Sequence, residues 1–258
     1  MSGYNLVTTP IDVTYRYDGS RDGFLCCVHT SVYQRELPTN IASIAPEQLS
    51  LLADKWIDTN PEQAQAVLTS IEKNIGKPMV SLLSHIMLCH HPDKEIKLLK
   101  LILAAFRHGG SLLGQLGNPV VADVLAMEKH LLGERHLLTG FARFKDYGDI
   151  LGAVISPKNF VLPLLGGHFR SRFPNENWMI YDDVHRAVLI YQDKQLQLTM
   201  VEELHFDDET ETELHYQALW KQFYHTIGIK ERLNPRCRMS MMPKRYWVNM
   251  TEVQDLVT

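Results

Sequence analysis

The order of apolar and polar residues near the N-terminus predicts a strand followed by a helix. Residues 13–18 (VTYRYD) alternate and are rich in β-forming side chains, which is typical of a short strand. Asp18-Gly19 is a turn signal, and Ser20 is a suitable N-cap for a helix that reaches to about residue 36. We therefore expect a compact strand–turn–helix that places Tyr17 and Asp18 near the first turn of the helix.

Helical spacing continues through residues 60–140 and then gives way to the two-residue period of strands. Asn60 and Pro61 are suited to be the N-cap and the first residue of a helix. Further helices are predicted at residues 78–89, 93–107 and 119–132. The later pattern predicts strands at residues 140–147, 150–156, 178–181, 187–191 and 195–201, and helices at residues 162–172 and 209–229.

Segregation of helices from strands indicates the α+β class rather than α/β. Short turns between successive strands favour an antiparallel β-meander. We expect the helices of residues 60–140 to form a layer packed against this meander, and the strand at residues 13–18 to join the same sheet. The chain shows no repeat or low-complexity linker, so we predict a single α+β domain over residues 1–258, with a helix-rich part at 20–140, a strand-rich part at 141–201, and a C-terminal helix and basic tail at 209–258.

Composition and cysteine usage indicate a globular protein of the cytoplasm. Hydrophobic residues make up 45% of the chain and charged residues 22%, which is ordinary for a folded domain. The four cysteines form no C-x-x-C pair, so free and mostly buried thiols are expected. No signal peptide is apparent at the N-terminus, and the apolar stretches are shorter than a membrane span requires. We therefore expect no association with a membrane.

The charges are unevenly distributed, although the formal net charge is only −4. Residues 202–213 hold seven acids and no Lys or Arg, whereas residues 230–245 hold six Lys or Arg and one acid. Such blocks can pair with each other inside the protein, or the basic block can face an anionic partner. The net charge does not separate these alternatives, but it argues against tight, nonspecific binding to duplex DNA.

The sequence predicts neither a metal site nor a cofactor. Cys89-His90-His91-x-Asp93 contains ligand types, but neighbouring residues at a helix end point in different directions, and no second cluster completes the set. A structural role at a helix end is therefore favoured. The phosphate-binding loop, the dinucleotide-binding glycine pattern and the common hydrolase motifs are all absent.

One candidate anion site is the segment His168-Phe169-Arg170-x-Arg172-Phe173. A histidine and two arginines within five residues can hold a phosphate through charge-assisted hydrogen bonds. The alternative is a helix whose polar face is solvated while its two phenylalanines pack inward.

A second candidate lies near the C-terminus, where cations alternate with aromatic residues. Phosphates bind Lys and Arg, and bases stack on rings, so this composition suits a nucleic-acid strand. In the alternative, Tyr246 and Trp247 anchor the tail in the core while the cations pair with the acidic block. The candidate residues are Arg232, Asn234, Arg236, Lys244, Arg245, Tyr246 and Trp247, and further pocket candidates are Tyr17, Asp18, Glu134, Arg143 and Asp182.

Several segments together resemble a family usually described as "probable DNA metabolism protein", which carries a domain of unknown function. The segments run in the same order from residue 15 to residue 247 and cover almost the whole chain. They are Tyr17-Asp18-Gly19-Ser20-x-x-Gly23-Phe24-Leu25, Glu134-Arg135-His136-x-x-x-Gly140-Phe141-x-Arg143-Phe144, Pro163-x-x-x-x-His168-Phe169-x-x-Arg172-Phe173, Trp178-x-Ile180-Tyr181-Asp182, Thr226-Ile227-x-Ile229-x-x-Arg232-x-Asn234-Pro235 and Met242-Pro243-x-Arg245-Tyr246-Trp247.

The resemblance implies a role in DNA repair or modification beside a radical-SAM protein. Some longer relatives carry a uracil-DNA-glycosylase-type domain after the last segment, so this chain is expected to be the stand-alone form. The family supplies no catalytic residues. We therefore expect an accessory protein that binds DNA, single-stranded or distorted, and presents it to a partner enzyme. The alternatives are a metal-independent enzyme acting on DNA or a nucleotide, and a protein–protein scaffold for the radical-SAM partner.

Overall fold

The computed structural model describes residues 8–43, 53–204, 206, 210–227 and 234–256, and the chain divides into two compact units. The first unit is Met1–Leu131 and the second is Leu132–Thr258. Each unit combines helices with its own β-sheet, so the α+β class predicted from the sequence is confirmed. The single domain over residues 1–258 stays a prediction.

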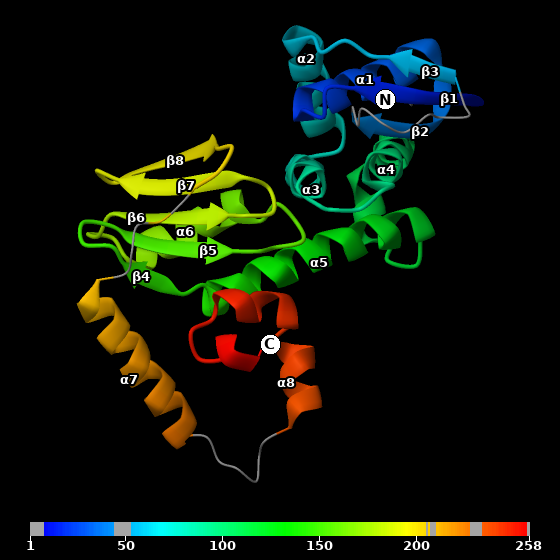
Figure 1. Ribbon diagram of the computed structural model, residues 1–258. Coiled ribbons are helices and arrows are strands. Elements are labelled where there is room, and N and C mark those ends of the chain that lie inside the picture. The colour runs from blue at the N-terminus through cyan, green and yellow to red at the C-terminus, as the bar shows by residue number, and fades with distance from the viewer. Residues whose placement is uncertain (1–7, 44–52, 205, 207–209, 228–233, 257–258) are drawn as a thin grey trace. The chain divides into compact units, whose positions relative to one another are not determined.

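The first unit contains a parallel sheet of three strands, in the order β2-β1-β3 (Figure 1). Its strands are β1 (Thr9–Tyr17), β2 (Glu36–Ser43) and β3 (Ala53–Trp56), and its helices are α1 (Arg21–Gln34), α2 (Pro61–Asn74), α3 (Lys77–Met87), α4 (Lys94–His108), the 3-10 helix η1 (Gly110–Gly114) and the first part of α5 (Pro119–Phe141).

The prediction that the strand at residues 13–18 joins the antiparallel meander is wrong. That strand is β1, which pairs with β2 and β3 in a separate sheet. Helix α1 connects β1 to the parallel strand β2, as a crossover between parallel strands requires. No strand was predicted at β2 (ELPTNIAS), because this segment contains a proline and few β-branched residues.

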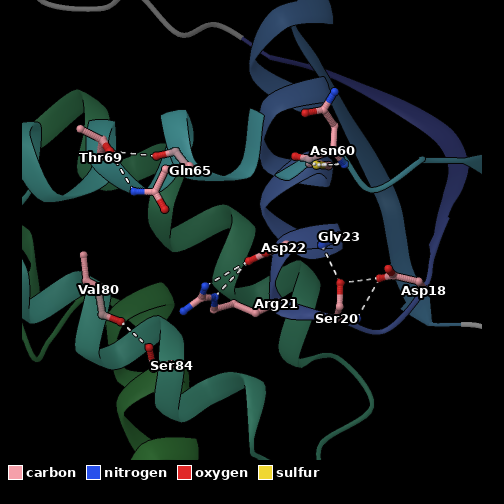
Figure 2. A network of polar contacts seen from close by, with 11 residues as sticks. Asp18, Ser20, Arg21, Asp22, Gly23, Asn60, Gln65, Thr69, Val80 and Ser84 are labelled. Carbon is pink, nitrogen blue, oxygen red and sulfur yellow. Dashed lines mark hydrogen bonds and ion pairs between the residues drawn. The ribbon is translucent and has the colours of Figure 1, made fainter. Parts of the chain in front are cut away.

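Local sequence signals explain why the helices of the first unit begin where they do. The side chain of Ser20 accepts a hydrogen bond from the backbone N–H of Gly23, and the side chain of Asn60 accepts from Glu62 and Gln63. Figure 2 shows the Ser20 cap beside Asp18 at the start of α1. Both N-caps were predicted from the sequence.

The second unit contains a five-stranded sheet in the order β4-β5-β6-β7-β8 (Figure 1). Three of the four strand pairings are antiparallel, as in the meander predicted from the sequence, but β5 and β6 pair in parallel because α6 crosses over between them. The elements are β4 (Phe144–Asp146), β5 (Leu151–Ile155), α6 (Leu162–Arg172), β6 (Trp178–Asp182), β7 (Ala187–Gln192), β8 (Gln195–Met200), α7 (Glu211–Ile227), α8 (Pro235–Met241), and the 3-10 helices η3 (Lys244–Asn249) and η4 (Gln254–Leu256).

An aromatic cluster forms the core between α6 and the sheet. Phe144 of β4 meets Phe169 and Phe173 edge-to-face, with ring centroids 5.1 Å apart in both pairs. Trp178 of β6 is fully buried and stacks on Tyr191 of β7. Because Phe169 is buried and Phe173 packs on Phe144, the inward side of the segment at residues 168–173 belongs to this core.

Two general expectations bear on the solution properties of the chain. Cys26, Cys27 and Cys89 are free and buried, and Cys237 is free and exposed, as the cysteine pattern predicted. None of the helices within the described ranges has both the length and the apolar composition to cross a membrane.

Candidate nucleic-acid interface

A buried carboxylate, Glu252, holds an arginine and a tryptophan in fixed positions in the second unit. Its oxygens accept hydrogen bonds from Nε and Nη2 of Arg143 and, at 3.2 Å, from Nε1 of Trp220. Arg143 also donates to the carbonyl oxygen of Gly140 at the end of α5, at 2.8 Å. The guanidinium plane and the indole ring are therefore both oriented before any ligand arrives.

Arg143 and Trp220 line a pocket of about 460 Å³ between α7 and the end of α5. Rings dominate its wall, since Phe144 and Tyr216 also line it. Tyr216 is 63% exposed and Trp220 is 41% exposed, so their faces are open to solvent. The remaining lining residues are Gly140, Glu213, Gln217 and Thr251.

A second pocket of about 210 Å³ adjoins the first, because Arg143 and Thr251 line both. Its character differs, since a second cation, Lys145, lines it together with the amides of Asn249 and Gln254. Tyr147, Gly152, Val154 and Val248 complete the wall. We call the two pockets the aromatic pocket and the basic pocket.

The carboxylate that orients Arg143 is ionised. Burial by itself would raise the pKa of Glu252, but the hydrogen bonds and the charge of Arg143 outweigh burial and hold the pKa below the ordinary value. The charge of Arg143 is thus balanced by Glu252, and Lys145 supplies a second cation to the basic pocket.

A second buried carboxylate, Glu134, joins two other residues singled out from the sequence. Arg245 Nη2 lies 2.7 Å from Glu134 Oε1, and the hydroxyl of Tyr246 donates to the same oxygen at 2.9 Å. The backbone N–H groups of Lys158 and Asn159 donate at 2.8 Å each, and the side-chain amide of Asn159 donates at 2.6 Å. With both oxygens occupied, Glu134 fastens α5 to the loop after β5 and to the C-terminal tail.

The aromatic residues of the tail are inside the protein. Tyr246 and Trp247 are buried, and Trp247 Nε1 donates to the carbonyl oxygen of Met242 at 3.0 Å. A base cannot reach these ring faces, so the geometry corresponds to the core-anchor alternative. Arg245 pairs with Glu134.

The other candidates of the tail have different surroundings. Asn234 is the N-cap of α8 and accepts from the N–H of Cys237. Arg236 is exposed on α8, and Lys244 Nζ lies 5.8 Å from the centre of the Trp247 ring. Arg232 lies outside the described residues.

His168, Arg170 and Arg172 are exposed on the outer side of α6. The guanidinium of Arg172 lies 5.9 Å from the centre of the Phe173 ring. Because α6 crosses over between the parallel strands β5 and β6, its C-terminal arginines lie near the start of β6, whereas Glu134 and Arg245 meet the loop after β5. The structure therefore does not gather these arginines and Arg245 into one cluster.

Asp182 is fully buried at the end of β6 and holds the turn that follows. Its Oδ1 accepts from the N–H groups of Val184 and His185, and its Oδ2 lies 2.8 Å from His185 Nδ1. The ring of His185 also packs against Phe160, with centroids 5.1 Å apart. Asp182 therefore positions a half-buried histidine that the sequence analysis had not singled out.

Tyr17 and Asp18 belong to the first unit and have structural contacts there. The buried hydroxyl of Tyr17 donates to Glu95 Oε1 at 3.0 Å. Asp18 Oδ1 accepts from the N–H and hydroxyl of Ser20, and Oδ2 accepts from the hydroxyl of Thr59 (Figure 2 shows the contacts with Ser20). Asp18 therefore fastens the end of β1 to the starts of α1 and α2, and Tyr17 fastens it to the start of α4.

Among the described residues, no group of three or more His, Cys, Asp or Glu side chains could hold a metal ion. Cys89 is buried, with its thiol near the carbonyl oxygens of His85 and Met127. The absence of a bound metal or cofactor in the purified protein stays a prediction for elemental analysis.

Sequence reasoning identified Arg143 but missed the residues that surround it. Glu252, Trp220, Tyr216 and Lys145 are isolated in the sequence and form no motif with characteristic spacing. Only the aromatic content of α7 (HYQALWKQFY) was a usable signal, because an amphipathic helix that exposes several rings is unusual.

Acid should destabilise the second unit, because two of its buried carboxylates become protonated and lose their ionic partners. Glu134 is also ionised, because its five hydrogen bonds outweigh burial and keep its pKa below the ordinary value. The pKa values of both carboxyl groups are lower in the folded state than in the unfolded state. Their contribution to the stability of the folded state is therefore fully present above the unfolded pKa of about 4.3, and it is lost as the pH falls through the folded pKa values.

Urea unfolding followed by tryptophan fluorescence at about pH 7 and about pH 3.5, on either side of the ordinary glutamate pKa, measures this loss. Trp178, Trp220 and Trp247 all report on the second unit. Equal unfolding free energies at the two pH values would contradict the assignment of both carboxylates as ionised partners.

Comparisons with known proteins give a family and little more. A family model described as a domain of unknown function, DUF4130, matches residues 92–252. No curated protein matches the chain. Among solved structures, the pGpG-specific phosphodiesterase PggH from Vibrio cholerae is similar at 12% identity and a TM-score of 0.33, over 70% of this chain and 81% of that one.

Proposed function

The chain belongs to the DUF4130 family, whose description names no reaction, and we propose from the site itself that it binds a DNA strand, single-stranded or distorted, and presents it to a partner enzyme. The observation that supports this proposal is the sharing of Arg143 between the aromatic pocket and the basic pocket.

The aromatic pocket has the chemistry of a nucleobase site. An unpaired base has two flat faces that stack on Tyr or Trp, and each such stack typically contributes about 1–3 kcal/mol. Trp220 is held in place by Glu252, so little side-chain entropy is lost when a base stacks on it. In duplex DNA the bases are already stacked, which favours a single-stranded or distorted substrate.

The basic pocket has the chemistry of a phosphate site. Lys145 provides positive charge beside the oriented guanidinium of Arg143, and Asn249, Thr251 and Gln254 provide hydrogen-bond donors. A base in one pocket and its phosphate in the other would place the sugar near Arg143, the residue common to both.

The residues that line the two pockets are suited to binding rather than to catalysis. The carboxylate that pairs with Arg143, Glu252, is occupied by Arg143 and Trp220. Glu213, which lines the aromatic pocket, accepts from the N–H of Asp146 and from Nε2 of Gln217. Within the described residues, no Ser, Cys or His side chain lines either pocket. The chemistry on DNA would then come from a partner, and the family resemblance suggests a radical-SAM protein.

Salt and mutation test this proposal. Affinity for a fluorescent single-stranded oligonucleotide should fall as salt rises, because neutralised phosphates release counterions. Lys145→Ala should reduce the slope of log K against log salt by about one. Trp220→Ala should weaken binding by about 5- to 150-fold, the equivalent of one lost base stack.

Arg172→Ala is the matched control, since it removes one exposed cation from α6. It should leave the slope unchanged, and melting temperatures should show that all variants are folded. If Arg172→Ala rather than Lys145→Ala changes the slope, the DNA site is on α6. If the wild type binds no DNA at low salt, the proposal is wrong and the scaffold hypothesis takes its place.

One observation favours the alternative of a metal-independent enzyme acting on DNA or a nucleotide. The buried Asp182 beside the half-buried His185 is the arrangement of a histidine oriented for proton transfer. Cleavage of the oligonucleotide by the wild type, lost in His185→Asn, would support this alternative.

A further inference from the structure

The five-stranded sheet of the second unit ends at β8, which has no neighbour on its outer side among the described residues (Figure 1). A strand edge exposes backbone N–H and C=O groups that another strand can pair with. Which groups are exposed follows from the hairpin that joins β7 to β8.

The β7–β8 hairpin fixes the hydrogen-bonding pattern. Its two turn residues, Asp193 and Lys194, have φ values of 52° and 61°, so the turn is the tight two-residue type, closed by the pair Gln192–Gln195. The closing pair is hydrogen-bonded, and hydrogen-bonded pairs then alternate along the ladder. The hydrogen bond from Val201 N to Arg186 O, at 2.9 Å, continues this alternation. The backbone groups of Leu196, Leu198 and Met200 therefore point toward the open edge.

The same three residues carry apolar side chains on one face of the sheet. Leu198 pairs with Leu189 and Leu196 approaches Gly166, so this is the face that α6 covers. The cover is incomplete at the edge, because Leu196, Leu198 and Met200 are 37%, 43% and 66% exposed. The strand (QLQLTM) contains no charge and no proline, the usual devices that prevent edge pairing.

The geometry points to a second copy of this chain as the occupant, paired antiparallel through β8 about a two-fold axis at Leu198. In this register Leu198 lies opposite Leu198 of the second copy, and Leu196 lies opposite Met200 of the second copy at both ends. Apolar side chains meet on the α6 face, and the outward-pointing N–H groups of each copy meet carbonyl oxygens of the other.

The order of residues along the strand favours self-pairing. The polar residues Gln197 and Thr199 flank Leu198, and the apolar residues Leu196 and Met200 follow on either side. The strand therefore presents the same pattern in both directions about Leu198, and a shift by two residues leaves one of these apolar side chains in each copy without an apolar partner. A shift by one places leucines opposite residues that point to the other face. A two-fold interface requires such self-complementarity.

Sedimentation velocity of the whole chain tests the inference, which does not depend on DNA binding. We expect reversible dimerisation with a dissociation constant of about 10–100 µM, because an interface of one strand pair is small. Leu198→Lys places two like charges together on the axis and should abolish the dimer. Leu214→Lys, which changes an exposed leucine of α7, is the control and should leave it intact.

A designed ion pair separates this register from nonspecific association. Leu196→Lys should weaken dimerisation at least tenfold, and Leu196→Lys combined with Met200→Glu should recover part of it, because the register places these two positions opposite each other. Melting temperatures should verify that the variants are folded. A monomeric wild type at about 500 µM, well above the expected constant, would overturn the inference. So would a dimer that Leu198→Lys leaves unchanged, or failure of the double variant to recover while Leu196→Lys weakens it.

Discussion

Glu134→Ala should lower the free energy of unfolding of the second unit by about 3–5 kcal/mol, because each buried donor left without an acceptor costs about 1–3 kcal/mol. The substitution leaves the hydroxyl of Tyr246, the amide of Asn159 and two backbone N–H groups without their acceptor. These groups are buried or partly buried, so water replaces the lost contacts poorly. The guanidinium of Arg245 loses its counterion at the same time.

Denaturant unfolding followed by tryptophan fluorescence measures this change, with Glu176→Ala as the control. Glu176 is an exposed glutamate of the same unit, and its removal should change stability by less than about 0.5 kcal/mol. The free energy of unfolding of the Glu134→Gln variant should fall between those of the Glu134→Ala and Glu176→Ala variants, because glutamine keeps the shape and one acceptor but loses the charge. If Glu134→Ala unfolds like the control, the network around Glu134 does not hold the tail in place.

The Glu134 network shows what the sequence could and could not predict about the site. Glu134, Arg245 and Tyr246 were all recognised as candidates, from segments separated by more than a hundred positions along the chain. No local pattern indicates that these segments meet, because the contact depends on how α5, the loop after β5 and the tail fold together. The sequence therefore identified these three members of the network but not that they contact one another.

The pockets around Arg143 were harder to anticipate for a related reason. Glu252 and Trp220 approach Arg143 only in the folded unit, and each is a single residue without a spacing signature. Composition favoured the 230–247 segment as the basic and aromatic surface. In the structure its aromatic pair is buried, and exposed rings occur on α7 instead.

Secondary structure was predictable where periodicity was long and turns were short. The strands β6 to β8 and the helix α6 follow the predicted ranges closely, because the hairpin turns and the proline near the start of α6 are local signals. Sheet membership of β1 was not predictable, since its partners are short strands, one with a proline, that pair in parallel across long connections. Helix α5 extends nine residues beyond the predicted end at residue 132, through Gly133 and Gly140, which usually weaken helices.

The segment Tyr17-Asp18-Gly19-Ser20-x-x-Gly23 now has a structural explanation, and Gly23 is its most sensitive position. A Cβ atom on Gly23 would lie 2.3 Å from Asp18 Oδ1, 2.8 Å from Thr59 Oγ1 and 2.9 Å from a ring carbon of Tyr17. Asp18 cannot simply move away, because Ser20 and Thr59 both donate to its carboxylate (Figure 2 shows the contacts with Ser20). A side chain at this position must therefore displace the end of β1 or break the cap of α1.

Gly23→Ala should accordingly destabilise the first unit by about 1–3 kcal/mol, the usual cost of overpacking. The opposite sign would be expected from helix propensity, because replacing a helical glycine by alanine typically stabilises by about 0.5–1 kcal/mol. Gly133→Ala is the matched control: Gly133 also lies in a helix, but a Cβ there would meet nothing within 4 Å. Circular dichroism melts of both variants should therefore show a lower melting temperature for Gly23→Ala and an equal or higher one for Gly133→Ala. A stabilised Gly23→Ala would mean that the Asp18–Ser20–Thr59 contacts yield at little cost, and that this segment does not fix the start of α1.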